Sequence, residues 1–310
     1  MSPAATFSAL LRGLPPPRGR RLLVAAARAH STAGGSRARG GLPRFHSPTL
    51  PSSKASARFI RCPLLGCSTR IAFQGDVVRI QGDEFWHMTR VLRLGINDRV
   101  ELFDGAGGLV EGSIQKVDKG GSDVKLLEDA RLIAPDGIQW HVYAAFGTLK
   151  GGRADWLVEK CTELGACSVT PLLTERCHTV AENRVDRLQR LVLAAVKQCQ
   201  RIHGMLLNPP IQIADLQTVV SQSKLAFLAS AESPPLLSTL PKSCNEESGL
   251  LIVGPEGDFT EEEVNVLKAA GAVPVGLGPC RLRVETATIS LLSALMLWSD
   301  VHRQETLKRR

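Results

Sequence analysis

The sequence predicts an α/β protein of two domains, and two patterns lead to that prediction. Residues 58–132 contain short strand-like runs separated by glycine-rich turns, which is the pattern of β-hairpins. From residue 138 onward, strand-like and helix-like segments alternate, and this alternation favours a mainly parallel sheet. The length of 310 residues suits about two domains, with the linker at Pro135-Asp136-Gly137.

The first domain is expected to contain one helix, Asp83–Leu94, followed by a series of strands. Its apolar face consists of Phe85, Met88 and Leu92. Three basic side chains recur at threefold spacing on another face: His87, Arg90 and Arg93. Such a stripe suits either phosphate contact or a solvated helix face. The expected strands are Arg99–Asp104, Leu109–Val117 and Asp123–Leu127.

The second domain is expected to alternate strands with helices. The strands are His141–Phe146, Val169–Leu173, Leu225–Ala229, Leu250–Val253 and Val273–Leu277. The helices are Asp155–Leu164, Arg184–Ile202, Glu261–Ala270 and Thr286–Val301. Gly165 and Gly271 are expected to end the first and third helices, and the second is expected to end near Gly204. Ligands of such sheets bind at the carboxyl ends of the strands.

Residues 1–57 differ in composition from the rest of the chain. They hold nine basic residues and no acidic one, so this segment accounts for the net charge of +8. The segment is rich in Arg, Ser and Ala and is broken by prolines, which is the profile of an organelle transit peptide. A basic tail that touches nucleic acid is the alternative. The composition does not distinguish targeting to mitochondria from targeting to chloroplasts.

Metal, membrane and nucleotide-phosphate functions find little support. The eight cysteines form no C-x-x-C pair, and no second pair at suitable spacing accompanies Cys177-His178, so no metal is expected. The longest apolar candidate, Ile289–Trp298, is shorter than the roughly 18–20 residues that a membrane span needs. No G-x-G-x-x-G and no G-K-[ST] loop occurs, which argues against a dinucleotide or NTP site.

The segment 250–264 carries the strongest functional signal. A buried strand ends in the turn Gly254-Pro255-Glu256-Gly257, and a helix begins directly after it with Thr260 and Glu263 as a capping box. Both glycines permit positive φ and close approach of a ligand to the backbone. Three consecutive glutamates open the helix and oppose phosphate there, so a neutral or cationic ligand fits better.

A second segment, Val275–Ala287, repeats the strand and Gly-Pro arrangement. Gly278-Pro279 follows the strand, and two arginines and a glutamate precede a long apolar helix. Because the carboxyl ends of parallel strands meet at one edge, both loops are expected to border one cleft.

These residues resemble the RsmE (ribosomal RNA small subunit methyltransferase E) family of the SPOUT superfamily. The family's G-P-E-G-G loop corresponds to Gly254–Asp258, and its L-G-x-x-x-L-R-x-E-T-A signature to Leu277–Ala287. The resemblance covers essentially everything after residue 58, in order. Further matches are Arg90–Arg93, Leu102–Gly105, Lys160–Gly165, Glu175-Arg176 and Gln198–Arg201.

The resemblance implies a PUA-like β-barrel that holds RNA at residues 58–135 and a SPOUT α/β domain with a trefoil knot at 138–310. It implies a homodimer that uses S-adenosylmethionine to methylate N3 of a uridine in the decoding region of small-subunit ribosomal RNA. The sulfonium cation and adenine edge of that cofactor suit a glycine loop flanked by acids. No metal and no membrane partner is implied.

The resemblance also implies site residues. The cofactor is expected to contact Leu228, Ala229, Gly254, Pro255, Glu256, Gly257, Leu277, Gly278, Leu282 and Thr286. Methylation of N3 requires loss of its proton, and a cation beside the developing anion would stabilise that charge. Arg201 and Arg283 are the candidates for this cation, with Glu285 orienting one of them or assisting proton removal. RNA is expected to contact His87, Arg90, Arg93, Lys150, Arg153, Arg184 and Arg187, although each also suits a solvated face.

Two positions depart from the family pattern. Asp258 replaces the second glycine of G-P-E-G-G, where a positive φ would be strained, and Val284 replaces the usual threonine and lacks its hydroxyl. The alternative function is therefore a non-catalytic RNA-binding ribosome-assembly factor. Restoring both family residues should then rescue cofactor binding. A third reading, methylation of a ribose 2′-hydroxyl, is disfavoured by Glu285-Thr286-Ala287.

Overall fold

A computed structural model describes residues 41–48, 50, 74–177, 182–242 and 244–308. The side chains of residues 182–184 and 303–308 lie outside this description. The predicted transit peptide, residues 1–57, falls mostly outside the described residues and stays a prediction.

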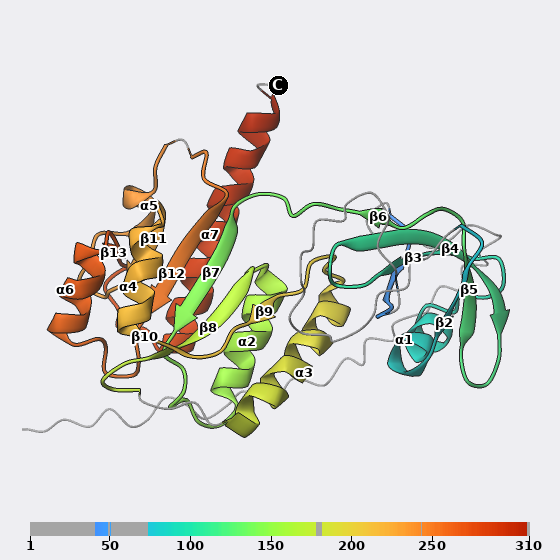
Figure 1. The fold of residues 1–310 in the computed structure, drawn as a ribbon, viewed down its shortest axis with the longest axis horizontal. Helices are drawn as coiled ribbons and strands as arrows, with labels where there is room; N and C mark the ends of the chain where they lie inside the picture. Colours follow the sequence, from blue (N-terminus) through green and yellow to red (C-terminus); the bar gives the residue numbers. More distant parts are fainter. Residues whose placement is uncertain (1–40, 49, 51–73, 178–181, 243, 309–310) are drawn as a thin grey trace, which may run out of the picture. The chain divides into compact units, whose positions relative to one another are not determined.

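The first domain consists of a six-stranded sheet and one short helical segment (Figure 1). The strands are β1 (Arg44–His46), β2 (Val77–Ile80), β3 (Arg99–Phe103), β4 (Gly108–Val117), β5 (Ser122–Leu126) and β6 (Arg131–Leu132). Their order is β1-β3-β4-β5-β2, with β6 paired to β4, and every pair except β1–β3 is antiparallel. The three predicted strands are confirmed.

The predicted start of this domain at residue 58 is wrong. Strand β1 lies inside the segment 1–57, and its Phe45 is fully buried in the core of the domain. A three-residue strand between Pro43 and Pro48 leaves no alternating pattern that sequence reasoning could detect.

The predicted helix is α1 (Gly82–Trp86) followed directly by a π-helix, η1 (His87–Val91). The N–H of Leu92 donates to the carbonyl of His87, 3.0 Å away and five residues back. This wider turn rotates the following side chains. Met88 is buried as predicted, but Leu92 is 36% exposed. Arg93, with φ 56°, lies beyond the helix, so the straight basic stripe predicted for this segment does not form.

The second domain is built on a parallel sheet, as predicted. Its strands are β7 (Gln139–Ala144), β8 (Ser168–Leu173), β9 (Leu206–Leu207), β10 (Ile211–Gln212), β11 (Ala226–Ala229), β12 (Ser248–Val253) and β13 (Val273–Val275). The order is β10-β8-β7-β12-β11-β13, with β9 also paired to β8. Because β11 lies between β12 and β13, the ends of these three strands are neighbours. The trefoil knot concerns how the chain threads its loops and stays a prediction.

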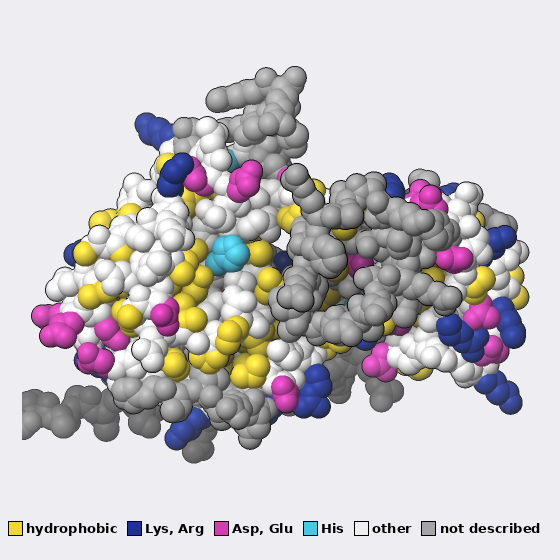
Figure 2. All heavy atoms as spheres, viewed as in Figure 1, with side chains coloured by type: hydrophobic (Ala, Val, Ile, Leu, Met, Phe, Trp, Pro, Cys, Tyr) yellow, Lys and Arg dark blue, Asp and Glu magenta, His cyan; other side chains and the backbone are white. Residues whose placement is uncertain are grey.

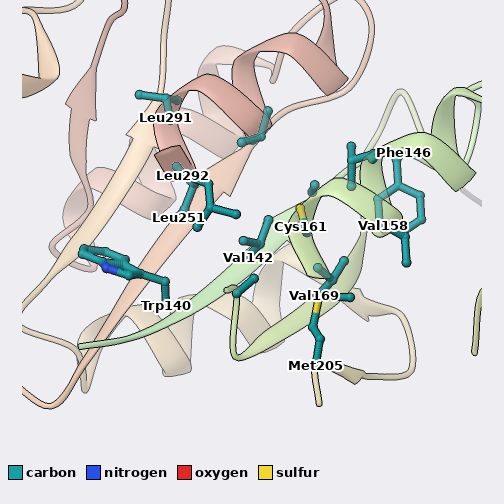
Figure 3. Packing of buried hydrophobic residues seen from close by; sticks show 14 of the residues in the cluster. Trp140, Val142, Phe146, Val158, Cys161, Val169, Met205, Leu251, Leu291 and Leu292 are labelled. Atoms are coloured by element: carbon teal, nitrogen blue, oxygen red, sulfur yellow. The ribbon is translucent and has the colours of Figure 1, made fainter. Parts of the chain in front are cut away.

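Helices cover both faces of this sheet. They are α2 (Arg153–Leu164), α3 (Glu182–Cys199), α4 (Ile213–Ser221), α5 (Leu236–Thr239), α6 (Glu261–Ala269) and α7 (Val284–Lys308). Val142 and Leu251 point toward α2, α3 and α7, and Figure 3 shows their packing with Cys161 and Leu292. The alternate strand residues Tyr143, Leu250 and Ile252 pack with α4 and α6.

Two of the three predicted glycine ends are confirmed. Gly165 (φ 104°) ends α2, and Gly271 (φ 111°) follows α6. Gly204 does not end α3, because that helix stops at Cys199 and Gln200 adopts φ 57°.

Helix α7 contains a 19-residue segment, Val284–His302, that is long and apolar enough to cross a membrane by length and composition alone. Sequence reasoning anticipated no such segment. Leu291, Leu292 and Leu295 of this helix are buried in the core that includes residues of β7 and β12. The core helix of a soluble protein passes the same test, so this segment is weak support for a membrane span.

Candidate active site

The carboxyl ends of β11, β12 and β13 surround a cleft of about 400 Å³. The last residues of these strands, Ala229, Val253 and Val275, line it, and each strand continues into a loop that also lines it. The volume lies within the range of small-molecule sites. The predicted meeting of the Gly254 and Gly278 loops at one sheet edge is confirmed.

Most of the residues predicted to hold a cofactor line this cleft. They are Ala229, Gly254, Pro255, Glu256, Gly257, Leu277, Gly278 and Leu282. Leu228 does not, because neighbouring strand residues face opposite sides and its side chain is buried in the other core with α4 and α6. Thr286 is exposed and also lies outside the lining.

Sequence reasoning missed several lining residues. They are Ala231, Val253, Asp258, Val275, Gly276, Val284, Ala287 and Leu291. Three of them lie on α7 at positions 284, 287 and 291, the spacing of one helix face. That periodicity could have identified them. Val284 is itself buried, so the apolar replacement of the family's threonine packs in the core.

The first loop, residues 254–258, turns sharply through two consecutive left-handed residues. Gly257 has φ 100° and Asp258 has φ 73°, and the N–H of Asp258 donates to the carbonyl of Pro255 at 2.9 Å. The positive φ anticipated at Asp258 is therefore real. Its carboxylate accepts a hydrogen bond from the N–H of Phe259 at 2.9 Å, a local bond that helps Asp tolerate this conformation.

Gly254 does not have a positive φ, and a glycine is needed here for close packing instead. A Cβ atom at this position would lie 2.9 Å from ring carbons of Phe259, closer than van der Waals contact allows. The structure therefore supports the predicted need for glycine here, but for a steric reason.

The segment after β8 holds this loop from outside the cleft. The guanidinium of Arg176 donates to the carbonyls of Gly257 and Asp258, the second at 3.2 Å. The predicted capping box is confirmed: the hydroxyl of Thr260, the N-cap of α6, accepts from the N–H of Glu263 at 3.3 Å, and the carboxylate of Glu263 accepts from the N–H of Thr260 at 2.9 Å. The other carboxylate oxygen of Glu263 accepts from the N–H of Glu175 at 2.9 Å.

The source of acidic charge at the cleft differs from the prediction. None of the three glutamates that open α6 lines the cleft, since Glu263 is buried and the other two are exposed on the surface. Figure 2 shows acidic side chains gathered at the end of the molecule that carries α6. Glu256 and Asp258 bring negative charge to the cleft instead, opposite Arg281 and Arg283 on the second loop.

The second loop is fixed at its start and exposed beyond it. The N–H of Gly276 donates to the carbonyl of Pro234 at 2.8 Å, and a Cβ atom on this glycine would lie 2.6 Å from the carbonyl oxygen of Ser233. Residues 277–283 are exposed, and among them Gly278 has φ 114°. The side chain of Arg283 therefore borders the cleft in contact with solvent.

Glu285 is the second residue of α7, and its side chain is only 10% exposed. It is not among the residues that line the cleft. One oxygen, Oε1, lies 3.6 Å from a guanidinium nitrogen of Arg153. The other, Oε2, is buried without a hydrogen-bond partner. A buried carboxylate oxygen without a donor is uncommon and marks a candidate functional group.

The structure does not place Arg201 at the cleft. Its guanidinium donates to the carbonyls of Thr162 at 2.7 Å, Ala166 at 3.0 Å and Gly165 at 3.4 Å, at the carboxyl end of α2. It lines a separate cavity with Cys199, and burial lowers the pKa of Arg201 below its usual range. Within one chain, the predicted catalytic role of Arg201 is therefore corrected to capping of α2.

The predicted RNA contacts divide into free and engaged side chains. Lys150, Arg90 and Arg93 are exposed. His87 is half-buried against Phe45, with ring centroids 6.1 Å apart. Arg187 pairs with Asp155, and Arg153 pairs with two carboxylates. The side chain of Arg184 lies outside the description.

Among the described residues, no three His, Cys, Asp or Glu side chains form a possible metal site.

The fold and cleft define an RNA methyltransferase. Residues 137–296 match the RNA methyltransferase domain family, which covers just over half of the chain, and residues 80–127 match the RNA methyltransferase PUA domain. The first domain is thus PUA-like and the second is the SPOUT-type α/β domain.

Relatives identify the family more closely. The chain is 31% identical over 249 residues to ribosomal RNA small subunit methyltransferase E of Synechocystis, covering 78% of this chain and 80% of that protein. It is 29% identical to the protein of the same name from Bacillus subtilis, covering 72% and 91%. The chain belongs to the ribosomal RNA small subunit methyltransferase E family.

Solved structures agree with this assignment. A putative methyltransferase from Legionella pneumophila in complex with S-adenosylmethionine is 25% identical with a TM-score of 0.60, covering 83% of this chain and 98% of that one. A probable rRNA-methyltransferase from Porphyromonas gingivalis is 26% identical with a TM-score of 0.63, covering 84% and 100%. S-adenosylmethionine is therefore the cofactor of this fold.

Proposed function

We propose that this protein transfers a methyl group from S-adenosylmethionine to N3 of a uridine in the decoding region of small-subunit ribosomal RNA. The observation that carries the proposal is the meeting of both family signatures, Gly254–Asp258 and Leu277–Ala287, around one cleft. Family membership supports small-subunit ribosomal RNA as the substrate. The methylated atom, N3 of a uridine in the decoding region, is what we add by proposal.

The residues of the cleft fit this cofactor. Glycines at 254, 257, 276 and 278 leave the backbone of both loops free of side chains, so a ligand can approach main-chain N–H and C=O groups closely. Glu256 and Asp258 supply negative charge that suits a cation, while Val253, Val275 and Leu291 supply an apolar wall. When bound, the cofactor supplies an electrophilic methyl group carried on sulfur.

Two side chains at the second loop suit the chemistry of the uracil ring. Arg283 borders the cleft and would stabilise negative charge that develops on the ring as its N3 proton leaves. Glu285 holds a buried carboxylate oxygen without a partner, which suits acceptance of that proton. Arg283 directly precedes α7, and Glu285 is the second residue of that helix.

Mass spectrometry of nucleosides from organellar small-subunit ribosomal RNA, with and without the gene, tests the proposal. We expect 3-methyluridine to be lost in the mutant and restored by the protein, but not by an Arg283→Ala variant. Unchanged 3-methyluridine in both organelles would contradict the proposal and favour the ribosome-assembly alternative. Loss of a 2′-O-methylated nucleoside instead would indicate ribose methylation.

We also propose that the protein acts as a homodimer. On one face of α7, Leu297 is 69% exposed and Val301 is 55% exposed, one helical turn apart, while other residues of this helix are in the core. Covering these side chains with a second copy would remove apolar surface from water. Light scattering after size exclusion should give twice the chain mass, and Leu297→Lys should shift the protein toward monomer.

We propose that the residues before β1 direct the protein to an organelle. Because Phe45 is buried in the core of the first domain, a cleavage site should lie before Arg44 rather than near residue 57. Residues 1–43 fused to a fluorescent protein should accumulate in mitochondria or chloroplasts. A uniform cytosolic signal would contradict this proposal.

A further inference from the structure

We propose that the helical segment of the first domain binds an unpaired base of the substrate RNA by stacking it on the indole ring of Trp86. Trp86 is the last residue of α1 and is 60% exposed, so most of its ring is in contact with solvent. Sequence reasoning did not select this residue. This inference rests on ribosomal RNA as the substrate in the proposed function, and it does not depend on which atom is methylated.

The packing of this segment turns Trp86 outward. Met88 is fully buried in the core of the first domain and Phe85 packs against that core, so these two residues fix the inner face of the segment. Trp86 and Arg90 are four residues apart, a spacing that places two side chains on one helix face, and both are exposed. The wider turn of η1 also leaves Val91 49% exposed. An aromatic ring, a guanidinium group and an aliphatic side chain therefore share the outer side.

The arginines of this segment differ from the other arginines of the first domain. Arg90 and Arg93 are exposed, and neither forms an ion pair with any residue that the structure describes. The other described arginines of the domain all pair with carboxylates: Arg44 with Glu101, Arg79 with Asp118 and Asp123, Arg99 with Glu111, and Arg131 with Glu128. Two unpaired guanidinium groups on the same segment as an exposed indole ring supply cations for the phosphates that flank a stacked base.

The acidic side chains of the segment leave these arginines accessible to phosphate. Glu84 accepts a hydrogen bond from the N–H of His46 at 3.1 Å. Asp98 accepts one from the N–H of Gly95 at 2.7 Å. Asp83 is exposed in the first turn of α1, where the helix dipole favours negative charge. Phosphate contact is therefore expected on the other side of the indole ring, at the two arginines.

An RNA base fits this surface better than an apolar protein partner does. Exposed aromatic rings beside cations bind unpaired bases because every base offers a flat face for stacking. Residues 80–127, which include Trp86, match the RNA methyltransferase PUA domain. An apolar partner would bury two guanidinium groups without a counter-charge, which is costly, whereas RNA supplies phosphates to pair with them.

The affinity of the full chain for single-stranded oligouridine RNA, measured over a range of salt concentrations, tests this inference. We expect Trp86→Ala to weaken binding about 5- to 100-fold without changing the salt dependence. Trp86→Phe keeps an aromatic ring and should bind within a few fold of wild type, whereas Trp86→Leu should lose as much as Trp86→Ala. Arg90→Gln should instead reduce the slope of log affinity against log salt by about 0.7. Val77→Ala, at a 59% exposed position on β2 of the same domain, is the matched control and should bind like wild type.

Tryptophan fluorescence gives a second readout of the same contact. Stacking on a base quenches indole emission, so RNA should quench the emission of the wild-type protein. Trp86→Phe should abolish this quenching. Trp156, on α2, is 44% exposed, so Trp156→Phe is the matched control and should keep it.

The outcomes separate this inference from the function on which it rests. Equal affinity of Trp86→Ala and wild type, or quenching that persists in Trp86→Phe, overturns the stacking role. An equal loss of affinity in Val77→Ala would assign the effect to the fold of the domain and also overturn it. A change of oligomeric mass in Trp86→Ala at unchanged RNA affinity would show that protein, and not RNA, covers the ring. A protein that binds RNA through Trp86 but forms no 3-methyluridine in small-subunit ribosomal RNA contradicts the proposed function alone.

Discussion

Two corners of the second domain carry arginines from family signatures, and they differ in how those arginines are used. At the carboxyl end of α2, Arg201 is half-buried and donates to three backbone carbonyls. At the cleft, Arg283 is exposed on a loop. Glu285, two residues later on α7 and not among the residues that line the cleft, has a buried oxygen without a partner. The first corner satisfies its polar groups within the chain, whereas the second leaves them available.

This difference separates groups that build the fold from groups that act on a ligand. A buried donor satisfied by carbonyls contributes to stability, and its removal leaves those carbonyls without a partner. A polar group left unsatisfied in a folded protein requires a different explanation, and at a cleft of ligand size that explanation is binding or catalysis. Substitutions at the two corners should therefore affect different measurements.

The largest effect is expected at Arg283. Arg283→Ala should reduce the rate of methyl transfer about 100- to 1000-fold, the range found when one group that stabilises a developing anion is removed. Stability should change little, because this side chain is exposed. Single-turnover kinetics check the rate of methyl transfer, and thermal unfolding of the same preparation checks the stability. Arg281→Ala, on the same loop, is the comparison, and equal loss in both variants would mean that the loop charge and not Arg283 matters.

The next effect is expected at Arg201, in stability. Arg201→Ala removes hydrogen bonds to three carbonyls at the end of α2, and we expect unfolding free energy to fall by about 1.5–3 kcal/mol. Methyl transfer per folded molecule should stay near the wild-type rate. Denaturant unfolding and active-site titration measure the two quantities. A large loss of rate in fully folded protein would return Arg201 to the catalytic candidates, through a second copy of the chain.

These corners also show how far sequence reasoning extends. Regular alternation of strands and helices placed the two loops at one sheet edge, because parallel strands leave no other arrangement for their carboxyl ends. The directions in which individual side chains point were harder to predict from the sequence. Arg201 lies within a family match, and Leu228 was an expected cofactor contact. The turn after α3 and the alternation along β11 nevertheless point both side chains away from the cleft.

Other features depended on interactions that single sequences do not display. The partners of Arg153 lie 103 and 132 residues away along the chain, so no spacing rule joins them. The π-helical turn at His87–Val91 shifts Leu92 outward although the apolar spacing is that of an ordinary α-helix.

The smallest effect is expected at Asp258, where the chain departs from its family. Asp258→Gly should relieve the cost of a left-handed conformation, but it should also lose the bond from Phe259 and loosen the unfolded chain. Since these contributions oppose each other, we expect stability to change by less than about 1 kcal/mol. Calorimetric affinity for S-adenosylmethionine should change by no more than a few fold.

Asp258→Asn sharpens this prediction, because asparagine tolerates the same φ without the charge. If the carboxylate contributes attraction for the cofactor's positive charge, Asp258→Asn and Asp258→Gly should weaken binding alike, and slightly. A tenfold gain in affinity for Asp258→Gly alone would show that the backbone at this position limits cofactor binding. The chain would then be a member of the family with weakened cofactor binding.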